Sequence, residues 1–154
     1  MVNSLESSAA RTPELFAFYA ALILLDANVL FSTHQKVYDL LDPAIVSRRS
    51  STERHHLFPK AYLKKNGIIE DRNINQLANF ALLEWLDNNA VSDEAPASYF
   101  PRFSARFTAP DLQKMMDLHA LPQGWEQMDY YDFLKERRKL MAQVTRRGYE
   151  KLPI

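Results

Sequence analysis

The sequence predicts a mainly α-helical domain built around a short two-stranded hairpin. Three observations support this fold class. Apolar residues recur at helical spacing after Thr12 and again between residues 130 and 147. The run 80–83 is short and apolar, which is typical of a buried strand. Pro59 has no N–H group and restricts Phe58 to extended geometry, so the segment just before it is not helical.

The N-terminal part is expected to be helical after a frayed start. Residues 1–11 are small and polar, and such termini are commonly poorly ordered. A helix should begin at Pro13, because Thr12 is a favourable N-cap and proline is favourable at the first helical position. A second helix is expected over His34–Leu41, before Asp42 and Pro43. An exposed polar loop at 48–52 then leads into the middle of the chain.

The middle of the chain predicts the order strand, strand, helix. The pair His55 and His56 should lie on an extended segment, and residues 60–66 should form one or two helical turns that end at Gly67. The strand at 80–83 follows. A helix should begin near Glu84 and end at Ala95-Pro96.

The C-terminal part predicts two more helices. Aromatic residues at 99–107 are expected to form a connector that belongs to the core rather than a base-stacking platform. One helix should begin at Thr108, and a turn is expected at 122–124. A long helix should then run from about Tyr130 to Arg147, with its apolar side chains facing inward. Residues 12–154 therefore form one domain, with a core at about 50–95 and helical flanks at 13–45 and 108–150.

Composition excludes several functional classes. The 154 residues include three glycines, so no glycine-rich phosphate loop is present, and no cysteines, so a metal site must use nitrogen and oxygen ligands. The absence of disulfides is typical of a cytoplasmic protein. The longest apolar run, at 15–25, is too short to span a bilayer, so no membrane association is expected. Net charge is zero, but basic residues surround the histidine pair.

The most informative pattern is the histidine pair followed by two spaced asparagines. His55 and His56 precede Asn79, which opens the apolar run, and Asn88 follows nine residues later. This is the order and spacing of an HNH nuclease site. Hydrolysis of a phosphodiester needs a divalent ion to neutralise developing charge and a base to activate water. One histidine can hold the ion while its neighbour takes the proton.

Some residues near this pattern have competing interpretations. Spacing favours Asn88 over Asn89 as the second ligand. Glu53 is expected to hydrogen-bond a histidine that binds the metal ion. The alternative is that it forms an ion pair with Arg54 or another basic residue at the surface. The histidines at 34 and 119 have no motif around them and are interpreted as ordinary surface or core residues.

The chain resembles the C-terminal HNH domain of GmrSD-type, modification-dependent restriction nucleases. Three stretches and the last helix carry this resemblance over about residues 13–152: Arg54-His55-His56-Leu57-Phe58-Pro59-Lys60-Ala61-Tyr62-Leu63, Ile74-Asn75-Gln76-Leu77-Ala78-Asn79-Phe80-Ala81-Leu82-Leu83-Glu84, Ala95-Pro96-Ala97-Ser98-Tyr99-Phe100 and Phe133-Leu134-Lys135-Glu136-Arg137-Arg138-Lys139-Leu140. The resemblance implies a helical domain around a ββα-metal core.

The resemblance also implies roles for single residues. His55 matches the metal-ligand position and His56 the general base. Asn79 matches the asparagine that ties the loop of the hairpin together, and Asn88 matches the second metal ligand. The implied cofactor is a divalent ion, Mg²⁺ or Mn²⁺. Many HNH domains carry a lysine three residues after the second ligand, where this chain has Val91.

The expected function is therefore a metal-dependent DNA endonuclease with little sequence preference. The resemblance implies the nuclease half of a phage-defence or restriction system, whose nucleotide-binding half lies on the same or another chain. The alternative is a catalytically inactive HNH-fold module for DNA binding or assembly. Phosphate contacts are expected from the basic residues around the site, with the C-terminal helix as the other candidate surface; the first set is Arg54, Lys60, Lys64 and Lys65, and the second is Arg137, Arg138, Arg146 and Arg147.

Overall fold

The computed structural model describes residues 12–41 and 54–153, and this part of the chain is mainly α-helical. Its two strands are β1 (Arg54–His56) and β2 (Phe80–Leu82). The described α-helices are α1 (Pro13–Leu24), α2 (Val37–Leu41), α4 (Lys60–Lys65), α5 (Asp71–Ile74), α6 (Trp85–Val91), α7 (Pro96–Ser104), α8 (Ala109–Leu118) and α9 (Tyr130–Tyr149). Two 3₁₀ turns, η2 (Leu77–Asn79) and η3 (Trp125–Gln127), complete these elements.

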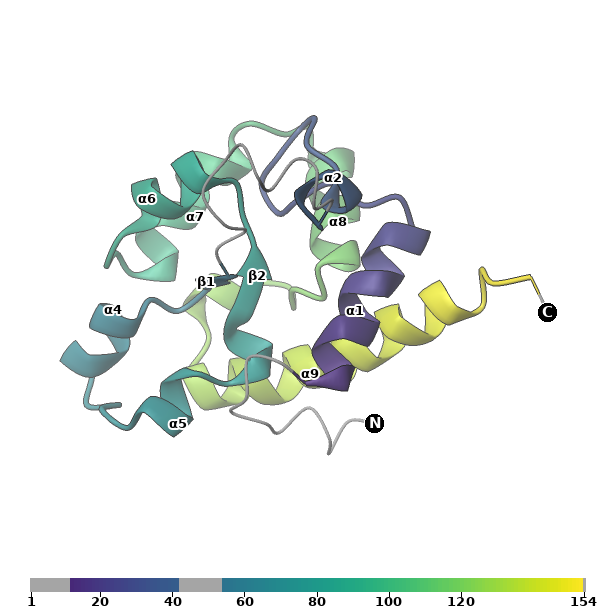
Figure 1. Ribbon diagram of the computed structural model, residues 1–154. Helices are drawn as coiled ribbons and strands as arrows, with labels where there is room; N and C mark the ends of the chain where they lie inside the picture. Colours follow the sequence, from purple (N-terminus) through teal and green to yellow (C-terminus); the bar gives the residue numbers. More distant parts are fainter. Residues whose placement is uncertain (1–11, 42–53, 154) are drawn as a thin grey trace.

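The two strands form an antiparallel hairpin at the centre of the molecule (Figure 1). His55 lies opposite Ala81, and His56 lies opposite Phe80. The chain passes through α4, α5 and η2 between the strands, and α6 follows β2 directly. The predicted order of strand, strand and helix is therefore present, and the histidine pair lies on an extended segment as expected.

Helices α1 and α9 pack against each other across one side of the hairpin (Figure 1). Gly148 is buried at their crossing, and a Cβ atom there would overlap the Cα and Cβ atoms of Ala21. Glycine at this position therefore permits the close approach of the two helices. Because α1 lies near the start of the chain and α9 near its end, this contact closes the fold.

The motif segment is anchored by aromatic packing. Trp125 is fully buried, and its ring lies 6.0 Å from that of Phe58, 5.4 Å from Phe100 and 5.7 Å from Phe133. Phe58 also packs on the ring of Tyr130 at 5.3 Å. Aromatic pairs of this kind add to the free energy gained from burial. The segment that carries the histidines is thus fixed to α7, η3 and α9.

Local capping chemistry explains where several helices begin. The Thr12 side chain accepts a hydrogen bond from Leu15 N, and Pro13 opens α1, as predicted. The Thr108 side chain accepts from Asp111 N at the start of α8. The long C-terminal helix begins at Tyr130, as predicted, and continues to Tyr149, slightly beyond the expected end.

The second helix was predicted to begin too early. It starts at Val37 rather than His34, because the preceding backbone pairs with an earlier segment: Val29 N donates to Gln35 O at 2.8 Å, and Val37 N donates to Ala27 O at 3.1 Å. A tertiary contact therefore overrides the helical spacing at 34–36.

The predictions for residues 84–107 were also partly wrong. Helix α6 ends at Val91, where Ser92 adopts φ +49°. The Ala95-Pro96 pair begins α7 instead of ending a helix, because proline is compatible with the first helical position. The expected aromatic connector is thus largely helical. Helix α5, just before Asn79, was not predicted, and the expectations for residues 1–11 and 48–52 lie outside the described residues.

Candidate functional site

The histidine pair and Asn88 line one cavity of about 270 Å³. β1 supplies both histidines, and α6 supplies Asn88. Lys60 at the start of α4 and Ser92 at the end of α6 also line it. The hairpin and the helix that follows it therefore bring together the residues that the sequence analysis predicted for metal binding and catalysis.

His55 faces Asn88, as expected for two ligands of one ion. The Nδ1 atom of His55 lies 2.5 Å from the Oδ1 atom of Asn88, whereas Asn89 is exposed. Burial lowers the pKa of His55 to about 4, so its imidazole is neutral at pH 7. The neutral ring is the form that binds metal ions. This position of Asn88 agrees with the prediction that Asn88, and not Asn89, is the second ligand.

These donor atoms fit a divalent ion with further oxygen ligands. An imidazole nitrogen and an amide oxygen are both neutral, and hard divalent ions keep several waters or phosphate oxygens. Within the described residues there is no cluster of three or more His, Cys, Asp or Glu side chains suited to metal binding. At this distance His55 Nδ1 and Asn88 Oδ1 are joined in one of two ways. Either Nδ1 carries a proton that it donates to the amide oxygen, or both atoms coordinate the same cation.

His56 is held by Asn75, a residue that the sequence analysis did not identify. The Nε2 atom of His56 lies 2.9 Å from the Oδ1 atom of Asn75. An amide oxygen only accepts hydrogen bonds, so Nε2 carries the proton and Nδ1 keeps its lone pair. Burial lowers the pKa of His56, and the ring packs on Phe80 with centroids 4.8 Å apart. The histidine is therefore neutral at pH 7, with one nitrogen able to accept a proton.

Asn79 ties the loop between the strands together, and this confirms the hydrogen bonding expected of it. The side chain is fully buried. Its oxygen accepts from Phe58 N at 2.8 Å, and its amide group donates to Phe58 O and Ile74 O, each at 3.1 Å. The Asn79 carbonyl also accepts from Leu57 N at 2.8 Å. Leu57 and Phe58, which directly follow the histidine pair, are thereby held by both the backbone and the side chain of Asn79.

Two further residues hold the backbone between the strands, one on each side of the contact that Asn79 makes. The Tyr99 hydroxyl donates to Leu57 O at 2.5 Å, and burial raises the pKa of that phenol well above its usual range. The Arg137 guanidinium donates to Ala78 O and Phe80 O, each at 2.7 Å. Sequence reasoning missed both roles, because each partner is distant along the chain. The available signal was that both residues lie in stretches that carry the family resemblance.

The predicted phosphate-binding cations are partly engaged with acidic residues. Lys60 forms an ion pair with Asp71 at 2.8 Å, and Lys65 forms one with Asp93 at 2.8 Å. Lys64 is exposed on α4. The Arg54 side chain and all of Glu53 lie outside the described residues, so the roles predicted for them remain predictions.

The C-terminal helix is a poorer phosphate surface than its sequence suggested. Arg137 is completely buried, so it is not available to DNA, and its inclusion in the alternative surface was wrong. Val91 is also fully buried and belongs to the core. A lysine there would have to bury its charge, so this chain offers no phosphate contact at that position.

The other two histidines behave as expected of ordinary residues. His34 is exposed, and His119 is buried with its Nε2 atom 2.8 Å from Asn28 O. Comparison with models of known protein families, with curated proteins and with solved structures finds no match to this chain. No helix among the described residues is long and apolar enough to cross a membrane.

Proposed function

We propose that this chain is a metal-dependent endonuclease of the HNH type that hydrolyses phosphodiester bonds of DNA. The observation that carries the proposal is the convergence of His55, His56 and Asn88 on one cavity, with Asn79 fixing the loop behind them. These are the residue types that the chemistry needs, at the order and spacing of an HNH site.

The proposed roles follow from the geometry of each side chain. His55 Nδ1 and Asn88 Oδ1 would hold a divalent ion, Mg²⁺ or Mn²⁺. When bound, such an ion stabilises charge on the scissile phosphate and on the leaving oxygen. His56 Nδ1 accepts the proton of the attacking water. As the imidazolium forms, its Nε2–H group keeps its hydrogen bond to Asn75, which stabilises the charged ring.

Asn75 is therefore proposed as a positioning residue for the base. By accepting from Nε2–H it selects the tautomer whose lone pair is on Nδ1. Asn79 and Tyr99 hold the backbone just after His56, and so limit the motion of the ring. A base fixed in this way is ready to accept a proton without reorganisation.

The wider biological role is proposed from the family resemblance. The chain would act as the nuclease half of a modification-dependent restriction or phage-defence system, working in the cytoplasm. Its nucleotide-binding half would lie on the same or another chain. DNA contact would be mainly to phosphates, because nothing in the sequence resembles a helix that contacts base edges.

A plasmid-nicking assay with Mg²⁺, Mn²⁺, Ni²⁺ or EDTA tests this proposal. The His56→Ala variant should cut about 10²–10⁴-fold more slowly, the usual contribution of a positioned general base. His34→Ala is the matched control, because His34 is exposed and outside the cavity. Asn75→Leu should slow cutting without weakening metal binding. Wild-type rates in His56→Ala would show that the assignment of the base is wrong.

The second candidate function is a catalytically inactive module for DNA binding or assembly. It is favoured by the ion pairs of Lys60 and Lys65 and by the buried Val91, which together reduce the positive charge available at the cavity. Such a module would bind DNA and leave plasmid intact with every metal ion tried.

A further inference from the structure

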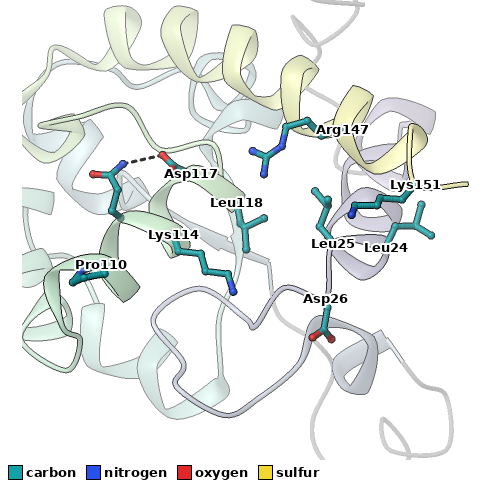
Figure 2. A pocket seen from close by; sticks show the side chains of 10 residues that line it. Leu24, Leu25, Asp26, Pro110, Lys114, Asp117, Leu118, Arg147 and Lys151 are labelled. Atoms are coloured by element: carbon teal, nitrogen blue, oxygen red, sulfur yellow. Dashed lines mark hydrogen bonds between the residues drawn. The ribbon is translucent and has the colours of Figure 1, made fainter.

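A second cavity, of about 630 Å³, lies where the C-terminal end of α1 meets α8 and the last turns of α9 (Figure 2). Its lining shares no residue with the cavity at His55 and His56. In Figure 1, β1 and α4 lie on one side of the molecule and the C-terminal end of α9 lies on the other. The two cavities are therefore separate features of the fold.

Three cationic side chains point into this second cavity. Lys114 comes from α8, Arg147 from α9 and Lys151 from the turn after α9, and Figure 2 shows their charged ends directed toward the same space. Among the described residues none of the three has an ion-pair or hydrogen-bond partner. This contrasts with Lys60, which lines the histidine cavity, and with Lys65 of the same helix, both of which are paired with carboxylates.

The acidic residues of the lining already have partners. Asp26 forms an ion pair with Lys36 at 2.8 Å, and Asp117 accepts a hydrogen bond from Gln113 at 2.8 Å. The Asp26 charge is thus neutralised locally, and Asp117 alone opposes the three cations. The lining carries an excess of positive charge.

Helix ends offer a different explanation for these cations. The C-terminal ends of α1 and α8 reach the lining, and cations are favourable near the carbonyl end of a helix. No side-chain hydrogen bond joins Lys114, Arg147 or Lys151 to a carbonyl group of the described residues. Their charged groups therefore remain available to a ligand.

We propose that this cavity binds a small ligand that carries a phosphate or diphosphate group. The planar guanidinium of Arg147 can donate two parallel hydrogen bonds to phosphate, and the two lysines add point charges around it. Leu25 and Leu118 supply apolar surface for the remainder of the ligand. The volume and concave shape are in the range of small-molecule sites, whereas duplex DNA is contacted along an extended surface.

Inorganic pyrophosphate is the probe, measured by calorimetry and by NMR of the leucine methyl groups. Pyrophosphate should bind and shift the methyl signals of Leu25 and Leu118. Arg147→Gln and Lys114→Gln should each weaken binding by about tenfold or more, because each removes charge-assisted hydrogen bonds. Lys135→Gln is the matched control: Lys135 is exposed on α9 outside the cavity, and binding should not change.

Several results would overturn the proposal. Absence of pyrophosphate binding at millimolar concentration would do so, as would equal weakening by the Lys135→Gln control. A short DNA duplex serves as the second probe. If the Arg147 and Lys114 variants weaken binding of the duplex while pyrophosphate does not bind, the surface is a nucleic-acid contact and not a small-ligand site. The plasmid-nicking activity plays no part in these measurements, so the outcome is independent of the proposed nuclease function.

Discussion

The Asn79→Ala substitution should destabilise the fold by about 3 kcal/mol. The fully buried Asn79 side chain makes three hydrogen bonds, to Phe58 N, Phe58 O and Ile74 O. After truncation Ile74 O still accepts a hydrogen bond from the Tyr130 hydroxyl at 3.2 Å. The structure gives no other described partner for Phe58 N or Phe58 O. Each of these two groups costs about 1–3 kcal/mol when it is left without a partner, so a total of about 3 kcal/mol lies toward the lower end of the expected range of about 2–6 kcal/mol.

Chemical denaturation followed by circular dichroism measures this loss, and a thermal scan should show a decrease of about 6–12 °C in Tm. Asn89→Ala is the control, because Asn89 is exposed on α6, and its free energy of unfolding should stay within about 0.5 kcal/mol of wild type. Asn79→Asp should be at least as destabilising as Asn79→Ala, because it places an anionic oxygen against two carbonyl groups. An Asn79→Ala variant with wild-type stability would refute the reasoning.

Two other predictions concern metal binding and pH. Asn88→Ala should abolish or strongly weaken the binding of Mn²⁺ measured by calorimetry, whereas Asn89→Ala should not. The reverse result would show that Asn89 is the metal ligand. Burial lowers the pKa of His119 to about 4, so the stability it contributes is complete above pH 6.5 and is lost as the pH falls toward 4. As the pH falls between these values, the free energy of unfolding of wild type should decrease by up to about 3 kcal/mol more than that of His119→Gln. Equal decreases would show that His119 is not the source of the pH dependence.

Sequence reasoning succeeded where the determining chemistry is local or belongs to the spacing pattern of the motif. Thr12 and Thr108 cap helices through their own side chains, and Pro59 stands immediately before the first residue of α4. The spacing of Asn79 and Asn88 placed one in the loop and the other beside His55. In each case the residue and its partner lie in one motif or one turn.

It failed where neither a local signal nor the spacing pattern marks two residues as partners. Asn75 precedes Asn79 closely, yet nothing in its surroundings in the sequence marks it as the partner of His56. Leu57 and Tyr99 are separated in the sequence by three α-helices, a 3₁₀ turn and a strand. Helix α6 ends where Ser92 adopts a positive φ. The sequence has no glycine or proline at this position, so nothing in it indicated that the helix would end.

Arg137 shows why charge in a sequence does not by itself identify a binding surface. It lies in a basic stretch, yet it is fully buried and bonds to three carbonyl groups, those of Ala78, Phe80 and His119. Burial lowers its pKa to about 10, so it remains charged at pH 7, and the carbonyl dipoles offset the cost of desolvation. Two of these carbonyls flank Asn79. The C-terminal helix therefore fixes the loop that positions the histidines, and the candidate site depends on the helical flanks as much as on its own motif.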